Sequence, residues 1–154
     1  MPTRPIVTRP RFSPAPVLLL GLLSSAPLLA REAAVARWVA PDPQKAVANP
    51  VASSTESIAR GQALYRKYCL TCHGEKGLGD GPVAKRLGFS AGNLADTQRM
   101  GRQTDGELAW KIANGRDPMP GFQKKMALTD QQIWDLVNFT RHLARAPRSD
   151  ARGE

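Results

Sequence analysis

Two cysteines and a histidine form the part of the sequence best suited to chemistry. Cys69-Leu70-Thr71-Cys72-His73 has the pattern C-x-x-C-H, and its two cysteines are the only ones in the chain. This spacing is typical of covalent attachment of a c-type haem. Thiols placed in this way can reach the vinyl groups on two neighbouring pyrroles of one porphyrin, and the next residue then lies beneath the iron. The motif therefore predicts haem bound covalently through Cys69 and Cys72, with His73 as an iron ligand.

Other sites also use paired cysteines. A thioredoxin-like dithiol needs a βαβ setting and usually places its reactive thiol at a helix start, whereas here the motif follows a helical pattern. A structural zinc ion needs four ligands, and the only other histidine, His142, does not give Cys2His2 spacing. A chance match to so short a motif is the remaining alternative. The helical pattern and the exclusive cysteine usage favour haem.

A six-coordinate haem iron needs a second axial ligand, and methionine is the usual partner of histidine in cytochromes c. The candidates are Met100, Met119 and Met126. Met119 stands in the run 118–122 (PMPGF), where the flanking prolines restrict the backbone and can hold the sulfur in place. We expect Met119 to be the ligand, with Met126, Met100 and His142 as the alternatives.

Helical patterns lie on both sides of the motif. One helix is expected to begin at Ser53, because Ser53-Ser54-Thr55-Glu56 fits a capping box, and to lead into the motif. A short helix is expected over Pro82–Leu87, with Asp80 as its cap. These two elements would place the C-x-x-C-H residues at the end of a rigid helix.

Two further helices are predicted after residue 103. One begins with the capping box at 104–107 and ends at Gly115, and the other begins with the capping box at 129–132. The last helix carries an apolar stripe at helical spacing, formed by Ile133, Leu136, Val137, Thr140, Leu143 and Ala144. No segment alternates with period two, so the domain is predicted to be all-α. Residues 88–103 are the longest expected loop, and a bound cofactor would give them a packing partner.

The first 36 residues resemble an export signal. Residues 1–16 carry three arginines and no acid, and residues 17–30 are an apolar run. Fourteen helical residues span about 21 Å, less than the roughly 30 Å of a bilayer core. We expect a signal peptide over 1–36, with an uncleaved membrane anchor as the alternative. Export then predicts a periplasmic protein.

The remaining boundaries follow from composition. Residues 37–52 contain three prolines and read as an extended lead-in, residues 53–146 as the domain, and residues 147–154 as a flexible tail. The net charge is +9, but the basic residues are scattered and lack interleaved aromatics, so we expect no nucleic-acid partner. A basic surface can instead speed docking to an acidic protein.

Several of these residues together resemble class I cytochrome c, and more narrowly bacterial periplasmic monohaem domains with an M-P-x-F loop. The resemblance covers residues 53–145 and rests on the C-x-x-C-H motif, Gly74, the turn at 79–82, the Met119-Pro120 loop and the helix that starts near 128–130. It implies about four helices packed around one covalently bound haem c. The interval between His73 and Met119 is shorter than in mitochondrial-type sequences, which leaves the path of the loop open.

The resemblance also implies roles for individual residues. Gly61 would lie where the first and last helices cross, with Tyr65 and Phe139 packing there. The carbonyl of Pro82 would accept a hydrogen bond from the ring of His73 and fix its orientation. Trp110 would pack against the haem edge or meet a propionate.

The function implied is electron transfer, without enzymatic activity. The leading hypothesis is a shuttle that carries single electrons between periplasmic redox proteins, steered by lysines such as Lys67, Lys76, Lys124 and Lys125. A dedicated haem subunit of a periplasmic oxidoreductase complex is the alternative. A ligand-binding or catalytic haem protein would need an open coordination position, and an intact Met119 ligand argues against it. A membrane contact is expected only if the N-terminal segment stays uncleaved.

Overall fold

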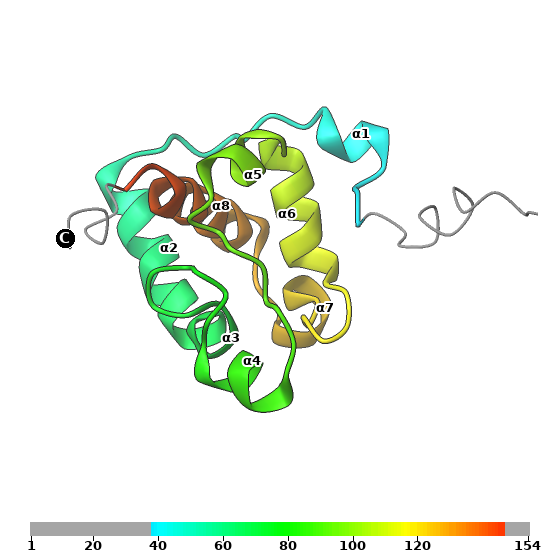
Figure 1. Cartoon of the computed structure of the whole chain (residues 1–154). Coiled ribbons are helices and arrows are strands. Elements are labelled where there is room, and N and C mark those ends of the chain that lie inside the picture. Colours follow the sequence, from blue (N-terminus) through cyan, green and yellow to red (C-terminus); the bar gives the residue numbers. More distant parts are fainter. Residues whose placement is uncertain (1–37, 147–154) are drawn as a thin grey trace, which may run out of the picture. The chain divides into compact units, whose positions relative to one another are not determined.

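The computed structural model describes residues 38–146, and the regular elements of this range are helices (Figure 1). They are α1 (Asp42–Lys45), α2 (Thr55–Tyr68), α3 (Leu70–His73), α4 (Pro82–Leu87), α5 (Thr97–Gly101), α6 (Asp105–Asn114), α7 (Phe122–Met126) and α8 (Asp130–Arg145). Within these residues the one β-type pairing is an isolated bridge between Arg116 and Met119. The all-α prediction is confirmed.

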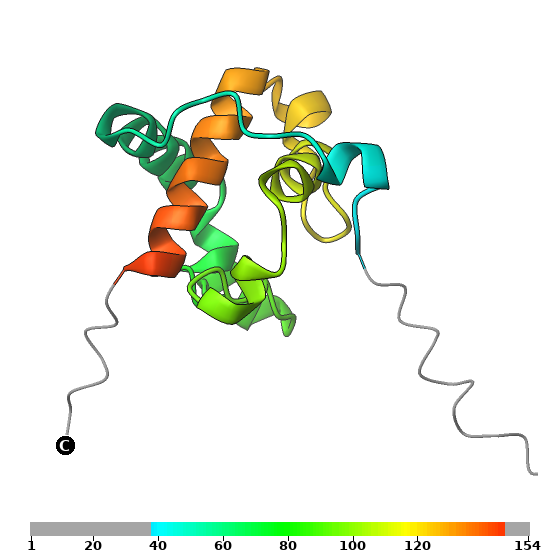
Figure 2. The same cartoon turned by 90° about the horizontal axis from the view of Figure 1, so that it is seen from above.

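Helices α2 and α8 form the main packing unit of the domain. Figures 1 and 2 show them crossing, with α6 beside α8. Gly61 lies at the crossing, where a Cβ atom would collide with the backbone carbonyl of Asp135 and lie 2.8 Å from the Cβ of Phe139. The rings of Tyr65 and Phe139 pack at 5.1 Å between centroids. The crossing predicted at Gly61 is therefore confirmed.

The helix starts follow the capping signals with some differences. Thr129 and Gln132 form the predicted capping box of α8, and Thr104 caps α6 through the N–H of Glu107. The start of α2 is one residue later than the predicted box, because Ser54, not Ser53, accepts the hydrogen bond of the Ser57 N–H.

The prediction that Asp80 caps α4 was wrong. The N-cap position is Gly81, and no side chain bonds there. The Asp80 carboxylate lies 3.6 Å from the Lys85 ammonium instead, so it pairs along the helix rather than with its free N–H groups.

Four short helices occupy segments where the sequence predicted no separate element. Helix α5 lies in the expected loop 88–103, capped by the Asp96 side chain at the N–H of Arg99. Helix α7 follows the methionine loop without a side-chain cap, α3 is the motif itself, and α1 is a single turn within the lead-in. Helices this short carry too few periodic positions for a sequence pattern to reveal them.

The lead-in packs on the domain rather than standing apart. Helix α1 contacts α6, and the Asn49 side chain donates to Asn138 on α8 at 2.8 Å. No helix among residues 38–146 is long and apolar enough to cross a membrane. The predicted signal segment 1–36 and the predicted tail 147–154 lie outside the described residues.

Candidate haem site

The C-x-x-C-H motif lies at a break between two helices. Cys69 ends α2, where its N–H still bonds the carbonyl of Tyr65 at 2.8 Å. The next four residues form α3, and the His73 N–H bonds the carbonyl of Cys69 at 2.9 Å. Both cysteines are therefore carried on helical backbone, half-buried and unpaired with each other. This placement agrees with the rigid attachment expected from the sequence.

Hydrogen bonds hold the turn that follows the motif against it. The Gly79 N–H donates to the carbonyl of His73 at 2.8 Å. The hydroxyl of buried Tyr65 donates to the carbonyl of Gly74 at 2.6 Å. Gly74 has a φ of 79°, a conformation that favours glycine. The glycines after His73 thus let the chain fold back tightly beneath the motif.

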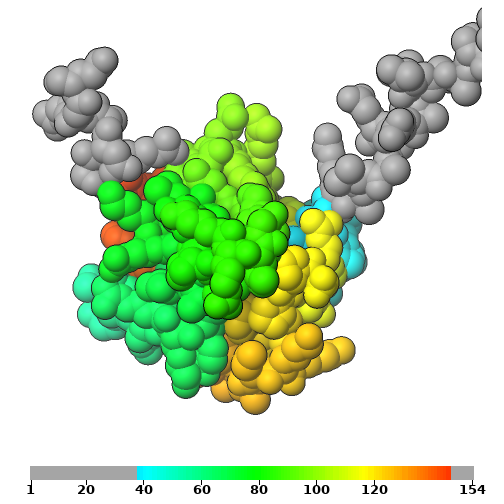
Figure 3. Space-filling model, turned by 60° about the horizontal axis from the view of Figure 1, so that its bottom comes forward, coloured from blue at the N-terminus to red at the C-terminus, as the bar shows by residue number. Residues whose placement is uncertain are grey.

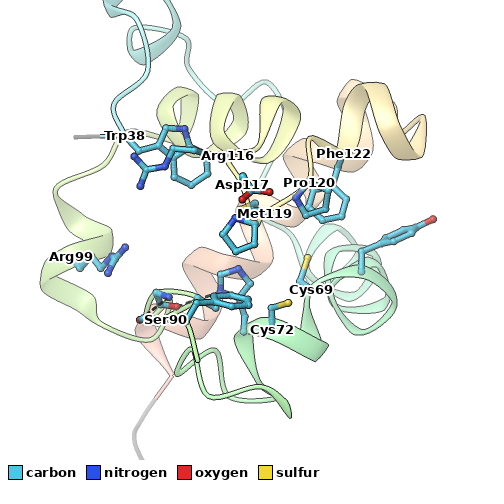
Figure 4. Close-up of a pocket in the computed structure, with 16 residues that line it drawn as sticks. Trp38, Cys69, Cys72, Ser90, Arg99, Arg116, Asp117, Met119, Pro120 and Phe122 are labelled. Atoms are coloured by element: carbon cyan, nitrogen blue, oxygen red, sulfur yellow. Dashed lines mark hydrogen bonds between the residues drawn. The ribbon is translucent and has the colours of Figure 1, made fainter. Parts of the chain in front are cut away.

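The motif faces a cavity inside the domain (Figure 4). The open part has a volume of about 200 Å³ and adjoins a deeper recess of about 110 Å³. Cys69, His73 and Met119 line both parts, and Cys72 lines the open part. The recess is walled by aliphatic side chains of Leu94, Met100, Leu108, Ile112 and Leu136. Residues far apart in the sequence therefore meet around one apolar hollow.

The ring of His73 is oriented by a backbone carbonyl, although not the one expected. Its Nδ1 atom lies 3.3 Å from the carbonyl oxygen of Gly92, so the role predicted for Pro82 was wrong. Pro82 starts α4, whereas Gly92 belongs to the loop that lines the cavity. Burial lowers the pKa of His73 below its ordinary value. The neutral ring, with a proton on Nδ1, leaves Nε2 able to bind a metal ion.

The burial of Cys69 separates this site from a catalytic dithiol. Burial, with a smaller contribution from Cys72, raises the pKa of Cys69 to about 12. Thioredoxin-like and other nucleophilic cysteines instead have a lowered pKa. Among the described residues, no group of three or more His, Cys, Asp and Glu side chains is placed to hold a metal ion. The geometry of this part of the chain thus favours neither the dithiol nor the zinc alternative.

The four candidates for the second ligand are placed very differently. Met119 lines both parts of the cavity. Met100 reaches only the recess, is 1% exposed in the core, and has its sulfur 4.0 Å from the Gln103 amide nitrogen. Met126 is 44% exposed, and His142 is an exposed residue of α8 that stacks on Phe139. Neither Met126 nor His142 lines the cavity.

The residues around this cavity fit a covalently bound haem. Cys69, Cys72 and the imidazole of His73 line the cavity from the junction of α2 and α3, and Met119 lines the same space from the loop after α6. The aliphatic recess offers a low-polarity environment for a porphyrin. Each chemical partner that a c-type haem requires is thus present on this one cavity.

Trp110, the aromatic residue predicted to meet the haem, does not line the cavity. Trp110 lines a separate surface groove together with Trp134 and Gln123, so its predicted contact with the haem edge is not found. Trp38, from the lead-in, lines both parts of the cavity, as does Arg99. The proline-rich lead-in carries no periodic pattern, and only the presence of a large aromatic residue marks Trp38.

The outer surface of the site is formed by loops. In Figure 3, the green surface of residues near 80–95 lies beside the yellow surface of the loop that follows α6. That loop contains the exposed residues Arg116, Asp117 and Pro118 next to half-buried Met119. The motif and the methionine are therefore brought together by segments that are distant in sequence.

Comparisons with known proteins agree with this geometry. Residues 56–139, just over half of the chain, match the family model described as Cytochrome C oxidase, cbb3-type, subunit III. No curated protein matches the chain.

Among solved structures, a chain of the Kuenenia stuttgartiensis reducing HAO-like protein complex is 26% identical, with a TM-score of 0.52, over 62% of this chain and 47% of that one. The chain thus spans about half the length of that structure. The c-type cytochrome KustC0563 is 30% identical, with a TM-score of 0.47, over 54% of this chain and 95% of that one.

Proposed function

We propose that this electron-transfer protein of the c-type cytochrome class carries single electrons on one haem c. The proposal proceeds from the fact that the chain belongs to the family described as Cytochrome C oxidase, cbb3-type, subunit III. Cys69 and Cys72 would bind that haem covalently. His73 and Met119 would be the axial ligands of its iron.

One observation carries the assignment of residues. Both thiols, the neutral imidazole of His73 and the sulfur-bearing side chain of Met119 line the same cavity of an all-α domain. Since the motif lies at the junction of α2 and α3 and the methionine in the loop after α6, their meeting is a property of the fold and not of the sequence motif. Of the other candidates, Met100 is buried in the core and lines only the recess, and Met126 and His142 do not line the cavity.

The protein's contribution is to bind, orient and exclude water. When bound, haem supplies the one-electron chemistry of iron. The carbonyl of Gly92 fixes the tautomer and orientation of His73. The aliphatic recess keeps water away and, with a thioether ligand, favours a fairly positive reduction potential. Two ligands held by the fold in both redox states keep the rearrangement on electron transfer small.

The number of haems and the lack of catalysis are parts of this proposal. The chain has only two cysteines, enough for one covalent attachment. An iron with both axial positions filled has no free position for a substrate, so we propose a carrier rather than an enzyme.

The location and partners are also proposals. The N-terminal arginines and apolar run indicate export, and covalent haem attachment at this motif suits a periplasmic protein. Its partners would then be redox proteins of that compartment, reached through a basic surface, since residues 37–154 carry 18 basic and 12 acidic side chains. Similarity to a chain of a redox complex supports a protein partner without identifying it.

The test is a spectroscopic redox titration of the full chain matured in a periplasm. We expect covalently bound haem in a one-to-one ratio, shown by mass spectrometry, and a single one-electron transition between two low-spin spectra. Carbon monoxide should not bind the reduced protein readily. A chain without covalent haem would overturn the proposal, and a high-spin reduced form that binds carbon monoxide would make a sensor or an enzyme the better reading.

A dedicated subunit of an oxidoreductase complex is the second candidate. The observation in its favour is the similarity to a chain of the reducing HAO-like complex. Size-exclusion chromatography of a native extract, followed at the haem absorbance, separates the two. A small haem protein eluting alone indicates a shuttle, whereas co-elution with a large oxidoreductase indicates a subunit.

A further inference from the structure

We propose that Trp38 is a positioning residue for the methionine turn. Its ring connects α6 to residues 116–119 and so holds Met119 over the cofactor cavity. The inference rests on the proposed function, in which Met119 is an iron ligand. Trp38 lies before residues 56–139, the part of the chain that matches the family model.

The Trp38 ring lies near two cationic side chains from different segments. The Lys111 ammonium is 5.6 Å from the ring centroid, and the central carbon of the Arg116 guanidinium is 5.1 Å from it. Cations within about 6 Å of an indole ring are attracted by its quadrupole, more strongly where water is partly excluded. Trp38 and Lys111 are half-buried, so the Lys111 contact lies in such a region, whereas Arg116 is exposed and meets the ring from the solvent side.

On α6, the Lys111 side chain is held in place by two neighbouring side chains. Its ammonium lies 2.7 Å from the Glu107 carboxylate and donates to the Gln103 side chain at 2.6 Å. The Lys111 and Glu107 side chains are only 14% and 9% exposed. A lysine bound in this way on α6 gives the Trp38 ring a defined place.

Arg116 is the other end and belongs to the turn that presents Met119. The Met119 N–H donates to the carbonyl of Arg116 at 2.8 Å, and the two residues form the isolated bridge. Figure 4 shows Trp38 and Arg116 close together, with Met119 farther into the site. Because this turn is short and its backbone bond joins Arg116 directly to Met119, a contact that restrains Arg116 also restrains Met119.

The segment before α2 keeps Trp38 in position. Gly106 of α6 lies so close to the carbonyl of Gln44 that a Cβ atom would collide with it. Farther along, the Asn138 side chain donates to the carbonyl of Val51 at 3.2 Å. The segment is thus attached to α6 at one point and to α8 at another, and Trp38 extends from it to the cavity.

Replacing Trp38 should make the Met119 ligand easier to displace. We would titrate the oxidised full-length protein with imidazole and follow loss of the methionine-to-iron charge-transfer band. An external ligand binds only the fraction of molecules in which the methionine has left, so its apparent affinity reports that fraction. For Trp38→Ala we expect the affinity to rise about tenfold, the size expected for losing one exposed and one partly buried cation–π contact.

Matched variants separate positioning from a general loss of structure. Trp38→Phe keeps an aromatic face and should restore most of the wild-type affinity. Val39→Ala changes an exposed neighbour on the same segment and should leave the affinity unchanged. Combining Trp38→Ala with Arg116→Gln should give less than the sum of the two single effects, because both remove the same contact.

The outcomes distinguish this inference from the function on which it rests. A wild-type protein without the methionine band would overturn the proposed ligand and this inference with it. If the wild type shows the band, but Trp38→Ala binds imidazole no more tightly than Val39→Ala, only the role of Trp38 is wrong. If Trp38→Phe binds imidazole as tightly as Trp38→Ala does, the proposed role of the aromatic face is also wrong. If Trp38→Ala fails to fold, the imidazole affinity of Arg116→Gln, which removes the same contact, is compared with that of Trp38→Phe instead.

Discussion

The two walls of the cavity are held together in different ways. The scaffold wall, formed by α2, α3 and α8, is joined by a close helix crossing and by buried side chains from both helices. The loop wall, formed by residues 88–95 and 115–121, is mainly held by local bonds, such as the one from the Met119 N–H to Arg116. The thiols and His73 belong to the scaffold wall, and Met119 to the loop wall.

This difference suits a carrier whose two iron ligands have different tasks. The scaffold wall would hold the proposed attachment cysteines and His73 on packed helices. The loop wall packs on the core through a few side chains, Leu94 and Met119 among them, while others such as Phe89, Ala91 and Pro118 line the cavity. Stability is therefore expected to be unevenly distributed, and the loop wall should depend more on haem.

The largest expected effect comes from removing the cofactor. The double variant Cys69→Ser, Cys72→Ser cannot attach haem, and we expect it to lose most of the roughly 5–15 kcal/mol by which a domain is stable. Hydrogen exchange followed by mass spectrometry should show the greatest loss of protection in residues 88–95 and 115–121. Equal loss across both walls would contradict the comparison.

A substitution at the helix crossing should damage the scaffold wall. For Gly61→Ala we expect about 3 kcal/mol of destabilisation, because the added methyl collides with the backbone of Asp135 and overpacking of this kind is costly. Denaturant unfolding measures the change. Gly101→Ala is the matched control, since a Cβ there meets nothing within 4 Å. A Gly61 variant as stable as the control would show that the crossing is more adaptable than it looks.

Asp135 links the two long helices by charge. Its buried carboxylate accepts from the Ser57 hydroxyl at 2.6 Å and from the Arg60 guanidinium at 2.8 Å. Burial raises the pKa of Asp135, but the bonds to Arg60 and Ser57 outweigh it, and the net pKa is lowered. The stability from this carboxylate is thus present above about pH 4, the unfolded value, and is lost as pH falls through the folded pKa.

Asp135→Asn should therefore cost about 2 kcal/mol near neutral pH, as expected for hydrogen bonds to a charged group. The difference from wild type should shrink below pH 4. Thermal unfolding between pH 3 and 7 checks both statements. Asp42→Asn, at an exposed carboxylate, serves as control. A difference that stays constant over this range would mean that the charge of Asp135 is not what stabilises the crossing.

The smallest effect is expected at a helix cap. Thr129→Ala removes the side-chain acceptor of the α8 capping box and should cost about 1 kcal/mol of unfolding free energy. Thr55→Ala, at an exposed first position of α2, should change stability less. Chemical denaturation of both variants decides the point.

The sequence predicted the scaffold wall better than the loop wall, for a physical reason. Capping residues and a long apolar stripe carry repeated information, so the starts of α2 and α8 were predicted at Ser53 and Thr129, within two residues of the observed starts, and that of neighbouring α6 was predicted at Thr104. Gly92 could not be identified as the partner of His73, because a backbone carbonyl has no residue type. Trp38 was missed because its contact depends on the path of an aperiodic segment.

That Met119 is the iron ligand remains a prediction, and it rests on the sequence pattern and on the lining of the cavity. The proline-flanked run indicated Met119, and the fold brings Met119 and Met100, but not Met126 or His142, to the cavity. Met100 is the competing candidate, and no sequence pattern could have shown that this core residue also lines the recess.

The most direct test of the central claim is the visible and near-infrared spectrum of the oxidised protein in Met119→Ala and Met100→Leu variants beside the wild type. We predict a methionine-to-iron charge-transfer band in the wild type that persists in Met100→Leu and disappears in Met119→Ala, while covalent haem is retained in all three. Persistence of the band in Met119→Ala would contradict the account and move the ligand to another methionine.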